Sequence, residues 1–236
     1  MKNLGEIMYR YEKKFLINNI QMEILKNNLS AALYLDSNIK NPDGSYFIRS
    51  LYFDDYKDTS YYQVIDGISK REKYRIRYYD YDSSYITLEK KSKINNLGKK
   101  EKSVISQEIT NMFINNKNFD SKEKVVNELN QKIKSDLYKP IVIIDYLRIA
   151  YTYPINDVRI TIDYNISCSY EINKFFEKGI NSIPLLEKDT AILEVKYNDY
   201  LPDFIKYIIN EKSLEMTSFS KYSTGRSMLE KIERSV

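Results

Sequence analysis

The sequence predicts one α+β domain over residues 1–236, built on an antiparallel sheet or closed β-barrel of about eight strands with flanking helices. A chain of 236 residues is long enough to bury one sizeable hydrophobic core. Eight segments show the period-two alternation that is typical of strands. Helical segments and turn sequences separate them in hairpin-like order, which favours an antiparallel arrangement over a parallel α/β fold.

The expected strands are identified by the alternation of apolar side chains with polar or charged ones. In the first strand, Arg10, Glu12 and Lys14 share one face, whereas Phe15 and Ile17 share the other. The eight expected strands are residues 10–17, 46–53, 72–79, 84–93, 99–105, 139–150, 158–164 and 191–197.

Most of the expected helices show apolar residues at helical spacing. They are residues 19–35, 59–68 and 121–137, a helix that opens at Leu201 and Pro202, and a last helix that begins after Thr224. Pro is well tolerated in the first turn of a helix. Turn signals at 41–44, 81–83 and 95–98 separate neighbouring elements.

The composition excludes several classes of mechanism. The chain has no His and a single Cys, so a Ser-His-Asp triad, a His-ligated zinc site and a thiolate metal site are excluded. Catalysis would have to use carboxylates, Lys, Arg, Tyr, hydroxyl groups or a hard metal ion with oxygen ligands. The formal charge is only +4, from 37 Lys and Arg against 33 Asp and Glu, so no nucleic-acid partner is expected.

The sequence predicts a cytoplasmic protein. Cys168 has no partner for an internal disulfide, and the N-terminus lacks the pattern of a signal peptide. No segment approaches the roughly 20 apolar residues that span a bilayer. Attachment to a membrane would therefore be peripheral or would require a separate membrane protein.

Charged residues follow the expected strands in period-two register. Arg75 and Arg77 share a face, and so do Arg159 and Asp163. A Glu-x-Lys pair occurs on three strands, at 12/14, 89/91 and 194/196. Taken singly, each strand fits an amphipathic strand with one solvated face. Taken together, the pairs favour a common function.

If the sheet closes with these faces inward, about nine cations and three carboxylates would line one channel, and an anion would have to fill it. A linear polyphosphate is the natural ligand. Arg donates in bidentate fashion to phosphate oxygens, and Lys provides compact charge. The carboxylates would hold Mn²⁺ or Mg²⁺ bridging the phosphates.

The chain resembles the catalytic domain of the vacuolar transporter chaperone (VTC) family, polyphosphate polymerases of the triphosphate tunnel metalloenzyme (CYTH-like) superfamily. Eight segments carry the resemblance in order over nearly the whole chain. They are RYEKKF at 10–15, LYFDD at 51–55, KYRIRY at 73–78, LEKK at 88–91, YLRIAY at 146–151, VRITID at 158–163, LEVKY at 193–197 and FSKYS at 219–223.

The resemblance implies an eight-stranded tunnel in which the terminal phosphoryl group of ATP is transferred onto polyphosphate. It implies a phosphate-binding set of Lys14, Arg75, Arg77, Lys91, Arg148, Arg159, Lys196, Lys100, Ser220 and Lys221. Glu194 would hold the metal. Glu12 and Glu89 match the family's tunnel carboxylates and would either bind metal or orient neighbouring cations. Lys99 and Lys102 are the alternatives to Lys100.

Two further hypotheses of function stay open. An inorganic triphosphatase of the same fold would use the same residues with water as the acceptor. A non-catalytic module would bind a polyanion without turnover. Asp54 and Asp55 are interpreted as turn residues after a strand, and the tyrosines of 78–85 as buried or edge residues.

Overall fold

Eight long antiparallel strands form the framework of the chain in the computed structural model, which describes residues 10–36, 41–94, 97–117 and 119–234. They are β1 Arg10–Asn18, β3 Ser45–Asp54, β4 Lys70–Tyr79, β5 Asp82–Ile94, β6 Leu97–Ile105, β7 Lys139–Tyr153, β8 Val158–Ser169 and β10 Thr190–Asn198. All eight predicted strands are confirmed.

Three two-residue strands are too short for alternation to reveal them. They are β2 Tyr34–Leu35, β9 Ile183–Pro184 and β11 Glu215–Met216. The predicted α+β class, an antiparallel sheet with flanking helices, is confirmed. Closure of the sheet into a barrel stays a prediction.

The chain divides into two compact units. The first unit comprises residues 1–46, 148–164 and 187–219, and the second comprises 47–147, 165–186 and 220–236. Strands β7 and β8 contribute residues to both. A single domain over the whole chain stays a prediction.

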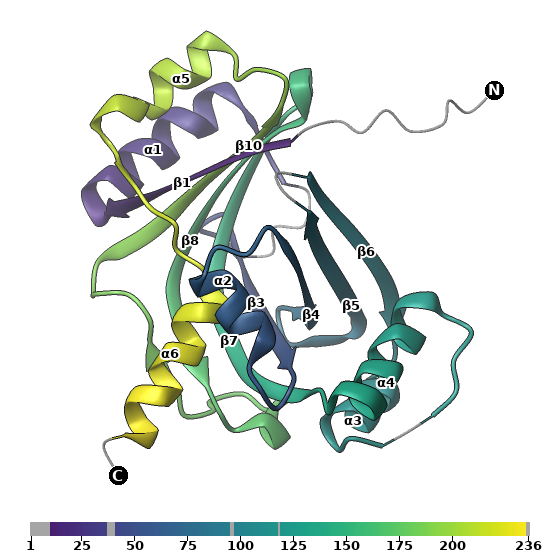
Figure 1. Cartoon of the computed structure of the whole chain (residues 1–236). Coiled ribbons are helices and arrows are strands. Elements are labelled where there is room, and N and C mark those ends of the chain that lie inside the picture. Colours follow the sequence, from purple (N-terminus) through teal and green to yellow (C-terminus); the bar gives the residue numbers. More distant parts are fainter. Residues whose placement is uncertain (1–9, 37–40, 95–96, 118, 235–236) are drawn as a thin grey trace, which may run out of the picture. The chain divides into compact units, whose positions relative to one another are not determined.

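In the first unit the strand order is β11-β1-β10-β8-β7, with β2 paired to β7. Helices α1 (Asn19–Ala32) and α5 (Asp203–Ile209) lie side by side against one face of β1 and β10 (Figure 1). This face is apolar because alternate strand residues point to it. Its core includes Phe15, Leu25, Ile160, Leu193 and Ile205.

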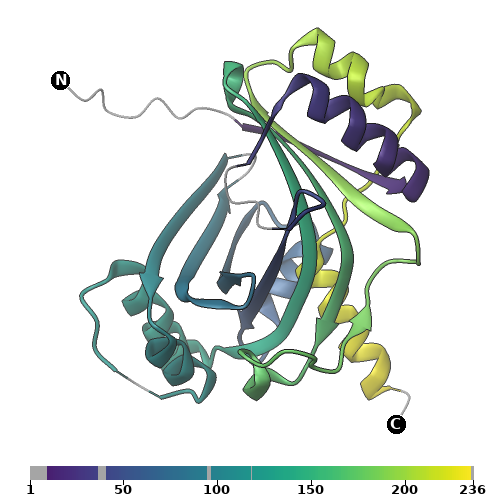
Figure 2. The same ribbon diagram turned by 180° about the vertical axis from the view of Figure 1, so that it is seen from behind.

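In the second unit the strand order is β8-β7-β3-β4-β5-β6, with β9 paired to β8. Its helices are α2 Thr59–Ile65, α3 Gln107–Ile114, α4 Lys124–Asp136 and α6 Lys221–Glu233. Helices α3 and α4 pack on β5 and β6, as Figure 2 also shows from behind. The core between them includes Phe53, Tyr74, Leu88, Phe113 and Leu129.

The last helix begins earlier than the sequence predicts. Helix α6 starts at Lys221 rather than after Thr224, because the Ser220 hydroxyl accepts a hydrogen bond from the Ser223 backbone N–H and caps the helix. Short 3₁₀ turns are η1 Ile155–Asp157, η2 Ile172–Lys174 and η3 Glu211–Ser213. The expected turn at 95–98 lies partly outside the described residues.

Helices α1 and α3 also differ from expectation, and α2 and α4 are each shorter than expected. Helix α1 ends at Ala32, since Tyr34 and Leu35 pair with β7 instead of continuing the helix. Helix α3 was missed, although Ser106 at its N-cap accepts a hydrogen bond from the Ile109 N–H at 3.2 Å. A capping serine ahead of apolar residues was the signal in the sequence.

A buried carboxylate joins α6 to α2. Asp54, at the end of β3, accepts hydrogen bonds from the backbone N–H groups of Ser60 at 2.8 Å and Tyr61 at 3.0 Å. The Tyr222 hydroxyl of α6 also donates to Asp54. The predicted turn role of Asp54 therefore includes fixing the start of α6.

We expect Asp54→Asn to lower the free energy of unfolding by about 2–4 kcal/mol, because an amide N–H₂ cannot accept from both the Tyr61 N–H and the Tyr222 hydroxyl. Denaturant unfolding measures the loss. Asp55→Asn is the control, since one Asp55 oxygen accepts from Lys57 and Thr59 and an amide oxygen can replace it. Equal losses in the two variants would contradict this account.

Candidate functional site

In the first unit the strand face turned away from α1 and α5 carries charged residues, and in the second unit the face turned away from α3 and α4 does so. On β1, β8 and β10 of the first unit, the apolar residues face α1 and α5, and the alternate positions are polar. On β3, β4 and β5 of the second unit the same alternation holds. The chain therefore presents two charge clusters, one in each unit.

The first cluster surrounds Glu194, which is only 7% exposed. A Glu194 oxygen lies 2.9 Å from Lys196 Nζ, and the carboxylate is 3.9 Å from both Lys14 Nζ and an Arg148 nitrogen. Burial alone would raise the pKa of Glu194, but these three positive charges hold it well below its usual range. Glu194 therefore stays ionised and holds three cations together.

Glu12 extends this Glu194 cluster along β1. Its oxygens lie 3.3 Å from Lys14 Nζ and 3.9 Å from Lys196 Nζ. Lys14 also donates to the Phe219 carbonyl at 3.1 Å. Burial lowers the pKa of Lys14, but Glu194 and Glu12 raise it above its usual value. Lys14 is therefore a permanent cation between two carboxylates.

Arg148 and Arg159 each have an acidic partner in the first unit. Arg148 makes a bidentate pair with Asp163, at 2.6 and 2.7 Å, and Asp163 is fully buried. An Arg159 nitrogen lies 2.7 Å from Asp36. In the strand register, Arg159 lies opposite Lys196 and Lys196 lies opposite Glu12. The six predicted residues of this unit thus share one face.

The second cluster surrounds Glu89, which is 4% exposed. One Glu89 oxygen is 2.6 Å from Arg75, and the other is 2.5 Å from Lys100 Nζ. Burial would raise the pKa of Glu89, but Arg75, Arg77 and Lys100 hold it far below its usual range. Both oxygens are engaged with cations, which favours an orienting role for Glu89 over metal binding.

Arg77 lies beside Arg75 on β4 and is fixed by hydroxyl groups. It donates to the Ser50 hydroxyl at 3.0 Å and to the Tyr146 hydroxyl at 2.8 Å. Because both hydroxyl groups are neutral, they do not compensate the positive charge of Arg77. Arg75 and Arg77 therefore share one carboxylate, Glu89, and the two adjacent guanidinium groups keep a net positive charge suited to an anion.

Strand alternation distinguishes the three candidate lysines of β6. Lys100 faces Glu89, whereas Lys99 lies on the opposite face and pairs with Glu101 at 3.0 Å. Lys102 is opposite Glu89 in the strand register and shares the face of Lys100. The geometry therefore favours Lys100 and leaves Lys102 as a neighbour.

The remaining predicted residues belong to the second unit. Lys91 is exposed on β5, between Lys73 and Lys100 in the strand register. The Lys221 ammonium lies 4.7 Å from the centre of the Tyr146 ring. Ser220 is the N-cap of α6, so its hydroxyl has a capping role in this structure.

Three residues near the clusters were not predicted. Asp163 orients Arg148. The sequence already indicates that Asp163 lies on the same strand face as Arg159, because the two positions differ by an even number of residues. Lys73 continues the series of Arg75 and Arg77, and its ammonium lies 5.0 Å from the Tyr222 ring centre. Tyr52 accepts a hydrogen bond from Arg75 at 3.2 Å. No sequence signal separates Tyr52 from a core tyrosine.

Glu12 and Glu194 are the carboxylates of the first unit that could hold a divalent metal ion. Glu12 and Glu194 both approach Lys14 and Lys196, so their oxygens lie near one another. Mg²⁺ is commonly held by one or two carboxylates together with phosphate oxygens and water. Among the described residues, no three His, Cys, Asp or Glu side chains form a metal site by themselves.

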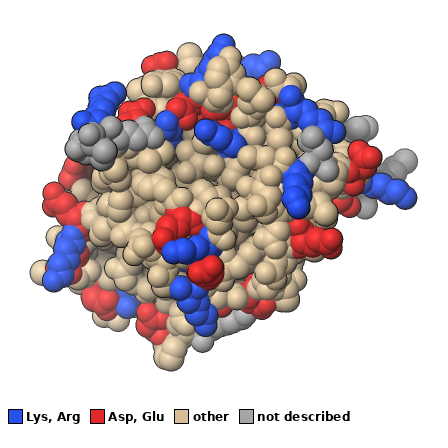
Figure 3. Space-filling view, turned by 90° about the horizontal axis from the view of Figure 1, so that it is seen from below, with Lys and Arg blue, Asp and Glu red and all other residues tan. Residues whose placement is uncertain are grey.

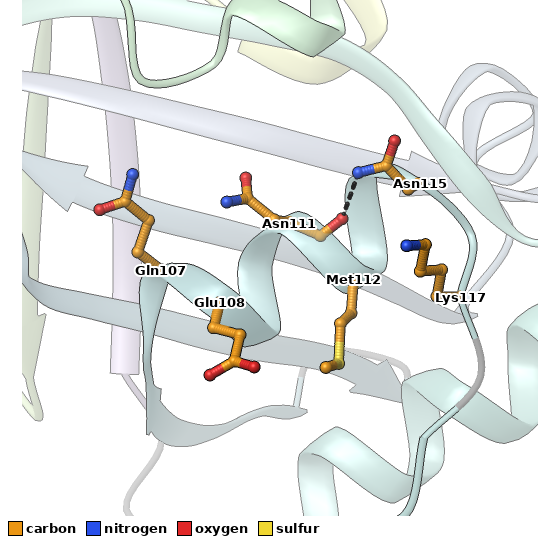
Figure 4. A pocket seen from close by; sticks show the side chains of 6 residues that line it. All are labelled: Gln107, Glu108, Asn111, Met112, Asn115 and Lys117. Carbon is orange, nitrogen blue, oxygen red and sulfur yellow. Dashed lines mark hydrogen bonds between the residues drawn. The ribbon is translucent and has the colours of Figure 1, made fainter.

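A pocket on α3 lies apart from the Glu89 cluster. A pocket of about 500 Å³ on α3, shown in Figure 4, is lined by Gln107, Glu108, Asn111, Met112, Asn115 and Lys117. No residue of the Glu89 cluster lines it, and Asn115 donates to its own helix at Asn111. On the face seen in Figure 3, most described Lys and Arg side chains lie beside Asp or Glu.

The fold combines antiparallel strands and flanking helices with cations gathered around buried carboxylates. A Bacillus halodurans protein described as a candidate adenylate cyclase shares this fold, with a TM-score of 0.50 and 15% identity over 87% of this chain and 89% of that one. A Pyrococcus horikoshii protein covers 94% of this chain and 99% of its own, at 12% identity and a TM-score of 0.48.

The family of this chain follows from a direct match to a family model. A model of the VTC domain matches residues 9–230. The chain belongs to the VTC domain family, which confirms the resemblance that the eight motifs indicate. No curated protein matches the chain. Within the described residues, no helix is long and apolar enough to cross a membrane.

The charge around Tyr52 predicts an unusual titration. Burial would raise the pKa of this phenol, but Arg75, Arg77 and Lys221 lower it to about 8. We expect one of the 23 tyrosines to ionise near this pH, well before an ordinary tyrosine at about 10. Tyrosinate absorbance measured against pH detects the early phase.

Tyr52→Phe should abolish that early phase. Tyr74→Phe should retain it, because burial raises the pKa of Tyr74 to about 12. An unchanged curve in Tyr52→Phe would show that the cations do not act on this phenol.

Proposed function

We propose that this chain is an ATP-dependent polyphosphate polymerase that transfers the terminal phosphoryl group of ATP onto the end of a polyphosphate chain. The observation that carries the proposal is the gathering of Lys and Arg around buried, ionised carboxylates on the strand faces of both units. Membership of the VTC domain family supports it.

The cations have the chemistry that phosphate binding needs. Arg75 and Arg77 offer adjacent forks of N–H donors to non-bridging phosphate oxygens. Lys14, Lys196 and Lys100 offer compact charges, each already oriented by a carboxylate. We propose that these residues bind the phosphate groups of ATP and of the polymer.

The transfer needs little acid or base catalysis. A terminal oxygen of the polymer attacks the γ-phosphorus of ATP, and the bond from that phosphorus to the β–γ bridging oxygen breaks. ADP leaves with the electron pair, and the polymer gains one phosphate. Because the attacking oxygen is already anionic, the absence of His in the sequence is no obstacle. Alignment and charge neutralisation by Lys and Arg are the main contributions.

Glu194 and Glu12 would hold Mn²⁺ or Mg²⁺, which would neutralise charge on the phosphates when bound. The same two carboxylates keep Lys14 and Lys196 in place. Glu194 therefore has two roles in this proposal, one toward the metal and one toward the cations.

The first test incubates purified protein with ATP and Mn²⁺, with and without a short polyphosphate primer. We expect ADP to appear together with a lengthening polymer. Glu194→Gln should lower the rate at least a hundredfold, because it removes the charge that orients three cations and would hold the metal. ADP, free phosphate and polymer length are followed together.

Glu23→Gln is the matched control, since Glu23 is exposed on α1, away from the Glu194 cluster, and forms an ion pair with Lys26. Its activity should equal that of the unaltered protein. Release of free phosphate without polymer would point to a triphosphatase. Polyphosphate binding without turnover in the presence of Mn²⁺ would leave only a binding module.

A further inference from the structure

Tyr52 lies in the Glu89 cluster rather than in the hydrophobic core. It shares one face of β3 with Ser50, whereas Leu51 and Phe53 on the other face belong to the core. It lies opposite Arg75 in the strand register and is 6% exposed. Its phenol is therefore buried among the residues proposed to bind phosphate.

The Tyr52 hydroxyl accepts a hydrogen bond but donates none among the described residues. Arg75 donates to it at 3.2 Å, and no acceptor for the hydroxyl's own proton is found in the part of the chain that the structure describes. A phenol can accept and donate at the same time. Buried donors are almost always paired, so this proton calls for an acceptor that the fold does not provide.

The packing of Tyr52 does not need the hydroxyl group. Its ring stacks on Tyr222, with centres 5.3 Å apart and planes inclined by 28°. A phenylalanine ring would make the same contact. Two other buried tyrosines of this unit differ in this respect, because Tyr222 donates to Asp54 and Tyr78 donates to the Phe175 carbonyl at 2.9 Å.

The charge around the hydroxyl indicates what the missing acceptor is. Arg75 and Arg77 on β4, and Lys221 on α6, are the cations whose charge acts most strongly on this phenol. Glu89, the carboxylate nearest to Arg75, has both oxygens occupied by Arg75 and Lys100. An excess of cations attracts an anion, and an oxygen of that anion can accept the hydrogen bond that the Tyr52 hydroxyl donates.

We infer that Tyr52 is a further phosphate-contacting residue, whose hydroxyl accepts from Arg75 and donates to a non-bridging oxygen of a phosphate group bound by Arg75 and Arg77. This inference rests on the proposed function, because it assumes that the Glu89 cluster binds phosphate. It adds a neutral donor to a set of cations. A neutral donor positions the phosphate group without adding to the repulsion among the cations.

The test compares the binding of tripolyphosphate by titration calorimetry, without nucleotide, at a pH of about 7, where the phenol is protonated. Tyr52→Phe retains the ring and removes only the hydroxyl. We expect its dissociation constant to rise about tenfold, the usual effect of losing one hydrogen bond to a charged group. Its melting temperature should stay close to that of the unaltered protein.

Tyr74→Phe is the matched control. Tyr74 is next to Arg75 on β4 but faces the core, and its buried hydroxyl has no hydrogen-bond partner among the described residues. Its affinity for tripolyphosphate should be unchanged. Equal weakening in both variants, or loss of folding in Tyr52→Phe, would overturn the inference, since the hydroxyl would then act on the fold.

The outcomes separate this inference from the proposed function. If the unaltered protein binds tripolyphosphate and Tyr52→Phe binds it equally well, the role of Tyr52 is wrong and the proposed function stands. If the unaltered protein does not bind tripolyphosphate, both are overturned. If only Tyr52→Phe is weakened, the hydroxyl contacts the phosphate.

Discussion

Buried carboxylates that hold several cations together are the interaction on which both clusters depend. Two like charges at about 4 Å repel by about 4 kcal/mol near a protein surface. Glu194 lies among Lys14, Lys196 and Arg148, and Glu89 joins Arg75 to Lys100. Each carboxylate offsets part of this repulsion, and in the Glu89 cluster the cations outnumber the carboxylate, which leaves a net positive charge. A phosphate chain can offset the remainder.

The strand alternation makes this arrangement possible. Alternate residues of β1 and β10 enter the core under α1 and α5, so the residues between them must lie on the other face. The apolar half of each strand drives folding, and the charged half is free to serve a ligand. Helices α1 and α5 in the first unit and α3 and α4 in the second lie on the core side, whereas α6 contacts the charged face of the second unit, where Tyr222 stacks on Tyr52.

The sequence alone predicts the eight strands and many of the charged residues that share a strand face, because both follow from local alternation, but it leaves open which of Lys99, Lys100 and Lys102 faces Glu89. Lys100 and Lys99 differ by one position and lie on opposite faces for the same reason. Asp163 and Tyr52 were missed as functional residues. Their importance comes from partners on neighbouring strands, Arg148 and Arg75, and a single sequence does not give the strand register. The sequence also does not reveal the capping role of Ser220, because it predicts that the last helix begins after Thr224 and not at Lys221.

The most direct test of this account compares paired lysines on opposite faces of the same strand by measuring tripolyphosphate affinity with titration calorimetry. Lys14→Ala and Lys100→Ala remove cations from the two clusters, one in each unit. Lys13→Ala and Lys99→Ala remove neighbours that pair with Glu211 and Glu101 on the other face. The account predicts a loss of affinity of about tenfold for the first pair and almost none for the second. Equal losses in the two pairs would contradict it, because net charge and not the cluster faces would then govern binding.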